Sequence, residues 1–167
     1  RIWVQTMIPP AITMTLYFII FGSLIGQRIG EMGGFDYMAY IVPGLIMMSV
    51  ITNSYANVSS SVFGSKFGRF IEEMLVSPIS NQTILLGYVT GGVARALSVG
   101  VIVTILSMFF TQLAIHNIFA VVSITLLTAV LFSLLGFING VYAKRFDDVS
   151  IVPTFVLTPL TYLGGVF

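Results

Sequence analysis

Residues 118–139 read IFAVVSITLLTAVLFSLLGFIN, a run of 22 residues without a charged side chain. The hydrocarbon core of a bilayer requires about 20 consecutive apolar residues in helical form. Backbone groups in lipid must form their hydrogen bonds within the segment, so this run is predicted to be an α-helix. The run therefore predicts an integral membrane protein.

The composition of the whole chain agrees with that prediction. Of 167 residues, 57% are hydrophobic and 8% are charged, whereas a soluble domain has about 25% charged residues. The net charge of +1 provides no basic surface for nucleic acid, so no nucleic-acid partner is expected. With no cysteine and one histidine, the chain is expected to bind neither a metal nor a cofactor.

Four further apolar stretches are long enough to cross a bilayer, which gives about five predicted helices. Their approximate bounds are 8–25, 37–56, 84–110, 118–139 and 149–167. No repeat or linker separates them, so residues 1–167 are predicted to form a single transmembrane domain. We expect this domain to be a fragment, because it lacks an initiator methionine and stops within an apolar run.

The basic residues predict the orientation. If the N-terminus is cytoplasmic, the inner segments hold all Lys and Arg residues except Arg28. Such an excess of positive charge on the inner side is typical of bacterial membrane proteins. The predicted location is the inner membrane, with a cytoplasmic N-terminus.

Enzymatic motifs are absent from the sequence. There is neither a P-loop nor a G-x-S-x-G motif. The paired acids, Glu72-Glu73 and Asp147-Asp148, lie in loops beside basic residues and are interpreted as solvated charge. The chain is therefore predicted to have no catalytic residue and not to be an enzyme.

Polar residues within the predicted spans are candidates for a translocation path or a helix interface. Arg95 is the only charge inside a span and is interpreted as reaching toward the inner interface; the alternative is a buried Arg that contacts the bundle or an anionic substrate. Asn53 and Asn57 either line a path or mark the point where the second helix enters water, and the second interpretation is favoured.

Pairs of glycines with the spacing G-x-x-x-G recur in three predicted helices. This spacing lets helices approach closely, and packing within the chain is favoured over a dimer contact. The pairs are Gly22 and Gly26, Gly87 and Gly91, and Gly136 and Gly140.

The longest polar connection, at about 63–83, contains a stretch with helical character. Residues 70–76 read FIEEMLV and are followed by Ser77-Pro78. Helices commonly end before a proline, so a short amphipathic helix is predicted. It either lies on the lipid surface or docks a soluble partner, and periodicity alone does not distinguish these.

Three separated motifs resemble the ABC-2 type transporter permeases, and the resemblance runs along essentially the whole chain. The stretch 71–80, IEEMLVSPIS, resembles the cytoplasmic loop signature of that family. Residues 153–167, PTFVLTPLTYLGGVF, resemble its fifth-helix signature, and IVPGL at 41–45 is similar to its second-helix entry.

The resemblance implies an all-α polytopic helix bundle of the ABC-2 (type V exporter-like) kind, with about five of six transmembrane helices present. It implies a homodimeric permease that works with a separate ATP-binding subunit, where ATP and Mg²⁺ are bound and hydrolysed. The permease would form the translocation path and act as an exporter. The loop after the second helix would couple the two subunits.

By the same resemblance, two groups of residues would face the ATP-binding subunit. The coupling loop would contribute Arg69, Phe70, Glu72, Glu73, Met74, Leu75 and Pro78, and a second inner loop would contribute Lys144, Arg145, Asp147 and Asp148. Two other functions stay open: a self-contained channel or secondary carrier, and a membrane scaffold that transports nothing.

Overall fold

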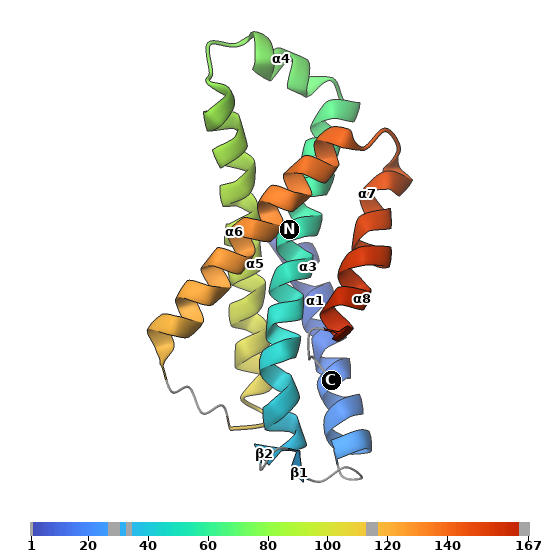
Figure 1. Cartoon of the computed structure of the whole chain (residues 1–167), viewed down its shortest axis with the longest axis vertical. Coiled ribbons are helices and arrows are strands. Elements are labelled where there is room, and N and C mark those ends of the chain that lie inside the picture. Colours follow the sequence, from blue (N-terminus) through green and yellow to red (C-terminus); the bar gives the residue numbers. More distant parts are fainter. Residues whose placement is uncertain (1, 27–30, 33–34, 113–116, 164–167) are drawn as a thin grey trace.

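The computed structural model describes residues 2–26, 31–32, 35–112 and 117–163 (Figure 1). Helices dominate, and one short antiparallel hairpin pairs Glu31 with Asp36. The elements are α1 (Ile2–Ile19), the π-helical η1 (Ile20–Gly26), β1 (Glu31–Met32), β2 (Phe35–Asp36), α3 (Tyr37–Phe67), α4 (Phe70–Val76), α5 (Asn81–Ser107), α6 (Ile118–Tyr142), α7 (Phe146–Val152), the π-helical η2 (Pro153–Leu157) and α8 (Thr158–Thr161).

Three helices of the described chain are long and apolar enough to cross a membrane: α3, α5 and α6. A shorter apolar helical stretch, Thr6–Gly22, runs through α1 into η1. Apart from the short hairpin, the described chain is thus a helical membrane bundle, as predicted, with additional apolar helices shorter than the three main spans.

The long helix α3 lies at the centre and packs against both α5 and α6, while α1 packs mainly on α5 (Figure 1). In the half of the bundle near the hairpin, Phe18 of α1, Leu45 of α3 and Val103 of α5 belong to one buried apolar cluster. Nearer the middle, a smaller cluster joins Val50 and Ala129 through α5. These contacts make α3 the element on which the others are positioned.

Glycines of α6 bring it against the backbone of α3, and we call this contact the α3–α6 seam (Gly136 and Gly140 of α6 on Tyr55 and Ser59 of α3). A Cβ atom on Gly136 would lie 2.5 Å from the carbonyl oxygen of Tyr55, and one on Gly140 would lie 2.9 Å from that of Ser59. The seam therefore requires glycine at both positions. This is the packing within the chain that the G-x-x-x-G spacing predicted.

The glycine pair of α5 behaves differently. Nothing lies within 4 Å of a Cβ placed on Gly87 or Gly91, so both face open space. The close approach on α5 is made instead by Gly92, where a Cβ would lie 2.3 Å from a methyl group of Val58. The spacing motif alone did not identify this residue.

Among the described residues, three of the five buried serines bond to their own helices, whereas the hydroxyls of Ser59 and Ser133 have no hydrogen-bond partner. The hydroxyl of Ser49 donates to the carbonyl of Ile46 at 2.8 Å, and that of Ser54 donates to the carbonyl of Ile51 at 3.0 Å. In α5, Ser107 makes the same kind of bond. These hydroxyls are therefore satisfied within one helix and leave the contacts between helices mainly apolar.

Three predicted helix limits need correction, in the second and third helices. The second helix continues to Phe67 rather than ending at 56, because Ser59 and Val62 are buried against α6 and their segment is held as helix by that packing. The third begins at Asn81, where the Ser80 hydroxyl accepts the Thr83 N–H at 3.3 Å, and ends at Ser107. The polar stretch 63–83 is thus largely helical.

The first and last helices also differ from their predicted ranges. The first begins at Ile2, with Pro9 inside it rather than at its start, and widens into a π-helix over its last turns. The last begins at Phe146 and is interrupted by a π-helical segment that starts at Pro153. Because Pro153 has no N–H, the carbonyl of Val149 lacks its helical donor, and it accepts the side-chain amide N–H of Asn139 at 3.3 Å instead.

Candidate docking surface at the α4 end of the bundle

The helix α4 lies at one end of the bundle, where it connects the ends of α3 and α5 (Figure 1). It ends at Val76 because Ser77 is extended, as is typical of a residue before a proline. The Ser77 hydroxyl donates to the carbonyl of Met74 at 2.7 Å and so satisfies one of the last carbonyl groups. The predicted short helix is therefore present with the predicted end.

The surface of α4 combines acidic and apolar side chains that the chain itself does not cover. No residue of α4 is buried. The exposed fraction is 60% for Phe70, 61% for Leu75 and 89% for Val76. Glu72 and Glu73 are exposed in the first turn, where a negative charge interacts favourably with the helix dipole. This mixture suits a contact with another surface.

A tight connection sets the direction of α4 relative to α3. Arg69 has φ 60° and ψ 8°, and it is the only non-glycine residue with positive φ in the described chain. Its predecessor Gly68 is tightly packed, since a Cβ there would lie 2.7 Å from the Phe70 ring. Residues other than Gly, Asn and Asp rarely adopt this conformation, so the connection holds a small local strain.

The start of α7, next to the predicted second loop 144–148, packs onto the end of α3. The ring of Phe146 lies 4.8 Å from that of Phe63 and 5.1 Å from that of Phe67, centroid to centroid. The Lys66 ammonium donates to the carbonyls of Val141 and Ala143 at 2.8 and 2.9 Å. These carbonyls lie at the end of α6, so Lys66 ties the ends of α3 and α6 together.

Asp148 fixes the start of α7. Its Oδ2 atom accepts the N–H groups of Lys144 at 2.8 Å and of Arg145 at 3.0 Å. These backbone hydrogen bonds, helped by the two nearby cations, lower the pKa of the Asp148 carboxyl below its ordinary value. The acid pair is therefore not simply solvated, because one of its members has a structural role.

The structure brings both predicted inner segments, 70–78 and 144–148, to the same end of the bundle (Figure 1). Sequence reasoning did not single out Lys66 or the three phenylalanines that join them. One signal was available: Lys66 is the only charged residue of α3, and a lone cation near the end of a helix is placed to bond to free carbonyls.

The three polar residues predicted within the spans do not form one site. The Asn57 Oδ1 atom accepts a hydrogen bond from Nη1 of Arg95 at 3.1 Å, which connects α3 with α5. The side chain of Asn53 instead donates to the carbonyl of Ser49 in its own helix at 2.9 Å. Asn57 and Arg95 therefore form a pair, and Asn53 does not join it.

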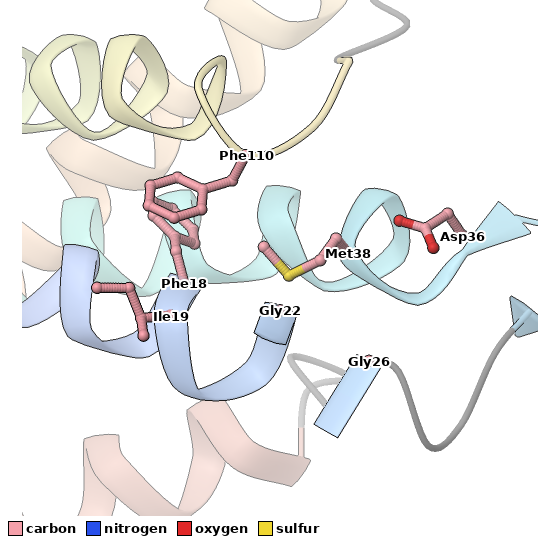
Figure 2. A pocket seen from close by; sticks show the side chains of 7 residues that line it. All are labelled: Phe18, Ile19, Gly22, Gly26, Asp36, Met38 and Phe110. Carbon is pink, nitrogen blue, oxygen red and sulfur yellow. The ribbon is translucent and has the colours of Figure 1, made fainter. Parts of the chain in front are cut away.

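Two cavities lie in the half of the bundle away from α4. Figure 2 shows the first, a space of about 390 Å³ between α1, the start of α3 and Phe110, where Asp36 is the one charged residue among the described residues of the lining. The second, of about 430 Å³, is an apolar groove between α3, α5 and α6 that includes Met47 and Thr125. Neither gathers several polar groups as a reactive site would.

Comparisons with known proteins agree with this architecture. The chain is 68% identical over 167 residues to the inner membrane transport permease YadH of Escherichia coli (strain K12), and spans 65% of its length. It is 24% identical over 151 residues to nodulation protein J of Rhizobium leguminosarum bv. trifolii, which covers 90% of the chain and 58% of that protein. No solved structure matches the chain significantly. The family profile of the ABC-2 type transporters matches residues 1–167, and the chain therefore belongs to the ABC-2 type transporter family.

Proposed function

We propose that this chain is the membrane-embedded part of a permease subunit of an ATP-driven exporter of the bacterial inner membrane, with its N-terminus in the cytoplasm. Its inner end docks a separate ATP-binding subunit, which binds ATP and Mg²⁺. Two copies of the permease form the translocation path. The name of the relative YadH, an inner membrane transport permease, supports the transport role.

The observation that carries the proposal is the exposed surface of α4. A helix of seven residues without a buried side chain gains little from its own packing. Leu75 and Val76 nevertheless project apolar surface, with Glu72 and Glu73 beside them. A partner that covers the apolar side chains and offers cations to the two carboxylates would stabilise α4 in this position.

The contacts around α4 would transmit movement of such a partner to the membrane helices. α4 is joined directly to α3 and α5, and the end of α3 is joined to α6 through Lys66. The Phe146 ring adds α7 to the same group of contacts. A displacement at α4 would therefore reach four helices over short distances.

The division of work between two subunits needs no catalytic group in the permease. Transport requires two packings of the helices with a small free-energy difference, and a ligand-bound partner that favours one of them. ATP binding and hydrolysis on the partner would supply that preference. The residues proposed to receive it are those of α4 and of the segment 144–148.

The test is co-purification of the full-length permease with its ATP-binding subunit. Glu72→Arg combined with Glu73→Arg should abolish co-purification and the dependence of ATP hydrolysis on the permease, because like charges would then meet across the contact. The matched control is Asp36→Arg combined with Gln112→Arg, since both residues are exposed at the opposite end of the bundle. The control should retain the complex.

The outcomes distinguish the remaining functions. A double reversal at α4 that still co-purifies normally would contradict the assignment of α4 as the docking element. Transport by the permease without any ATP-binding subunit would indicate a self-contained channel or carrier. Absence of any nucleotide-dependent structural change in the complex would indicate a scaffold.

A further inference from the structure

Arg95 is a cation in the middle of a membrane-spanning helix with no acidic residue to balance it. It lies 14 residues after Asn81 and 12 before Ser107, which is roughly 21 Å and 18 Å along α5 at 1.5 Å per residue. α3, α5 and α6 contain no Asp or Glu. An unbalanced charge at such a depth is costly, so it commonly marks a functional contact.

The hydrogen bonds of Arg95 are incomplete. A guanidinium has five N–H donors, and the Asn57 carbonyl oxygen takes one of them at 3.1 Å. The Nε atom is buried and has no hydrogen-bond partner among the described residues. The neutral amide of Asn57 orients the guanidinium without neutralising it. The pair thus has both charge and donor capacity left over.

The surface of α5 one turn before Arg95 is open. Gly91 is one turn before Arg95 on the same face of α5, and nothing lies within 4 Å of a Cβ placed there. Side chains of a helix lean toward its N-terminus, so Arg95 leans over the turn that contains Gly91. The Arg95 side chain is only partly buried. The open face at Gly91 therefore adjoins a partly buried cation.

We propose that Arg95, oriented by Asn57, binds the anionic headgroup of an amphipathic molecule at the open face of α5 beside Gly91. The chemistry is a phosphate or carboxylate on an apolar tail, because the guanidinium fork matches such oxyanions and the surrounding helix faces are apolar. The molecule is either a phospholipid of the bilayer or the transported substrate. Only the second source rests on the proposed function.

The first experiment measures binding of phosphatidylglycerol to the full-length permease in neutral detergent, with phosphatidylcholine of the same acyl chains as the neutral comparison. The wild type should prefer phosphatidylglycerol, and Arg95→Gln should lose about tenfold in affinity for it. Ser98→Ala, a neutral change one turn further along α5, should bind as the wild type does. Equal binding by the wild type and Arg95→Gln would overturn the proposal.

A second variant keeps the test decisive if Arg95→Gln does not insert. Asn57→Asp is nearly isosteric and places a carboxylate where the amide oxygen now contacts Arg95. It should raise the thermal midpoint in neutral detergent and abolish the preference for phosphatidylglycerol, because the internal carboxylate competes with the ligand. An Asn57→Asp variant that still prefers phosphatidylglycerol as the wild type does would show that Arg95 is not the binding group.

The source of the anion is decided by transport. If phosphatidylglycerol bound at Arg95 stays in place during ATP hydrolysis, the site holds a structural lipid; if it moves across the bilayer only with an intact Arg95, the site belongs to the transport path. Both outcomes support the anion site. Because binding is measured without the ATP-binding subunit, the result is independent of whether α4 docks that subunit.

Discussion

The α3–α6 seam and the helix α4 lie close to each other but are held in opposite ways. In the seam, Gly136 brings one helix against the backbone of the other, with no room for a side chain. On α4, no residue is buried and Val76 is almost fully exposed. The seam is complete within this chain, whereas α4 presents a surface that the chain does not cover.

The difference separates two kinds of mutational effect. Changes in the seam act on packing that the chain must make to fold, so they should lower thermal stability. Changes on the exposed face of α4 remove little intramolecular contact, so they should leave stability unchanged and alter only binding to a partner. Measurement of both properties on each variant tests whether the division holds.

The largest effect is expected in the seam, for Gly136→Leu. A Cβ at this position would lie 2.5 Å from the Tyr55 carbonyl oxygen, so the helices must separate. Overpacking of this kind costs about 1–3 kcal/mol and occasionally more. The thermal midpoint and the yield of monodisperse protein in detergent measure the loss.

The matched control for that variant is Gly87→Leu, another helical glycine of a G-x-x-x-G pair. Nothing lies within 4 Å of its Cβ position, and leucine is the better helix former. Its thermal midpoint should equal or slightly exceed that of the wild type. A loss as large as that of Gly136→Leu would show that this face of α5 is packed in the intact protein.

A smaller effect is expected where the seam ends, for Lys66→Met. The variant removes the ammonium that bonds to the carbonyls of Val141 and Ala143 while it keeps a long apolar side chain. Because Lys66 is exposed, the loss of stability should be about 1 kcal/mol. Chemical denaturation measures this loss of stability, with Lys144→Met as the control variant. An unchanged stability would mean that α3 and α6 are held by the glycine contacts alone.

At the junction of the two regions, Arg69→Gly should stabilise the protein slightly. Arg69 has φ 60°, which glycine adopts without strain, but glycine also loses more chain entropy on folding. The free energy of unfolding should rise by roughly 0.5 kcal/mol, measured as a shift of the thermal midpoint. Arg69→Ala, which keeps the strain, is the control and should not be stabilised. Equal behaviour of both variants would locate the effect in the arginine side chain.

The smallest effect is a pH dependence at Asp148. Its pKa is lowered in the folded protein, so the carboxylate contributes stability above the ordinary carboxyl pKa and loses that contribution as the pH falls through the lowered value. Below about pH 4, the wild type should lose stability more steeply than Asp148→Asn, which keeps an acceptor oxygen but does not titrate. Parallel curves for the two proteins would exclude a stabilising role of the charge.

Much of the fold could be predicted because apolar length determines membrane helices directly. The uncharged run 118–139 lies within α6, and the end of α4 before Pro78 follows from the steric effect of proline. The end of α3 was missed because Asn57 and the serines that follow suggest a wet loop. Their segment stays helical because α6 packs on it, and such a tertiary contact leaves no local signal.

The role of the candidate site stays a prediction, and its connections within the bundle were not predicted. The two inner segments were expected near one partner, and the structure places them at one end of the bundle. The hydrogen bond between Asn57 and Arg95 joins residues 38 positions apart. Lys66 reaches carbonyl groups 75 and 77 positions away. Spacing within a single helix does not indicate pairs at such separations.

The serines that bond to their own helices have a consequence for how the bundle can change shape. Because Ser49, Ser54 and Ser107 are satisfied within one helix, the side-chain hydrogen bonds that sliding of α3 past α5 would break are those of Arg95 with Asn57 and of Tyr88 with Ser65. The barrier to such sliding would then be mainly steric, set by the passage of methyl groups such as those of Val58 across Gly92. A bundle of this kind can change register at low enthalpic cost while the hydrogen bonds within each helix stay in place.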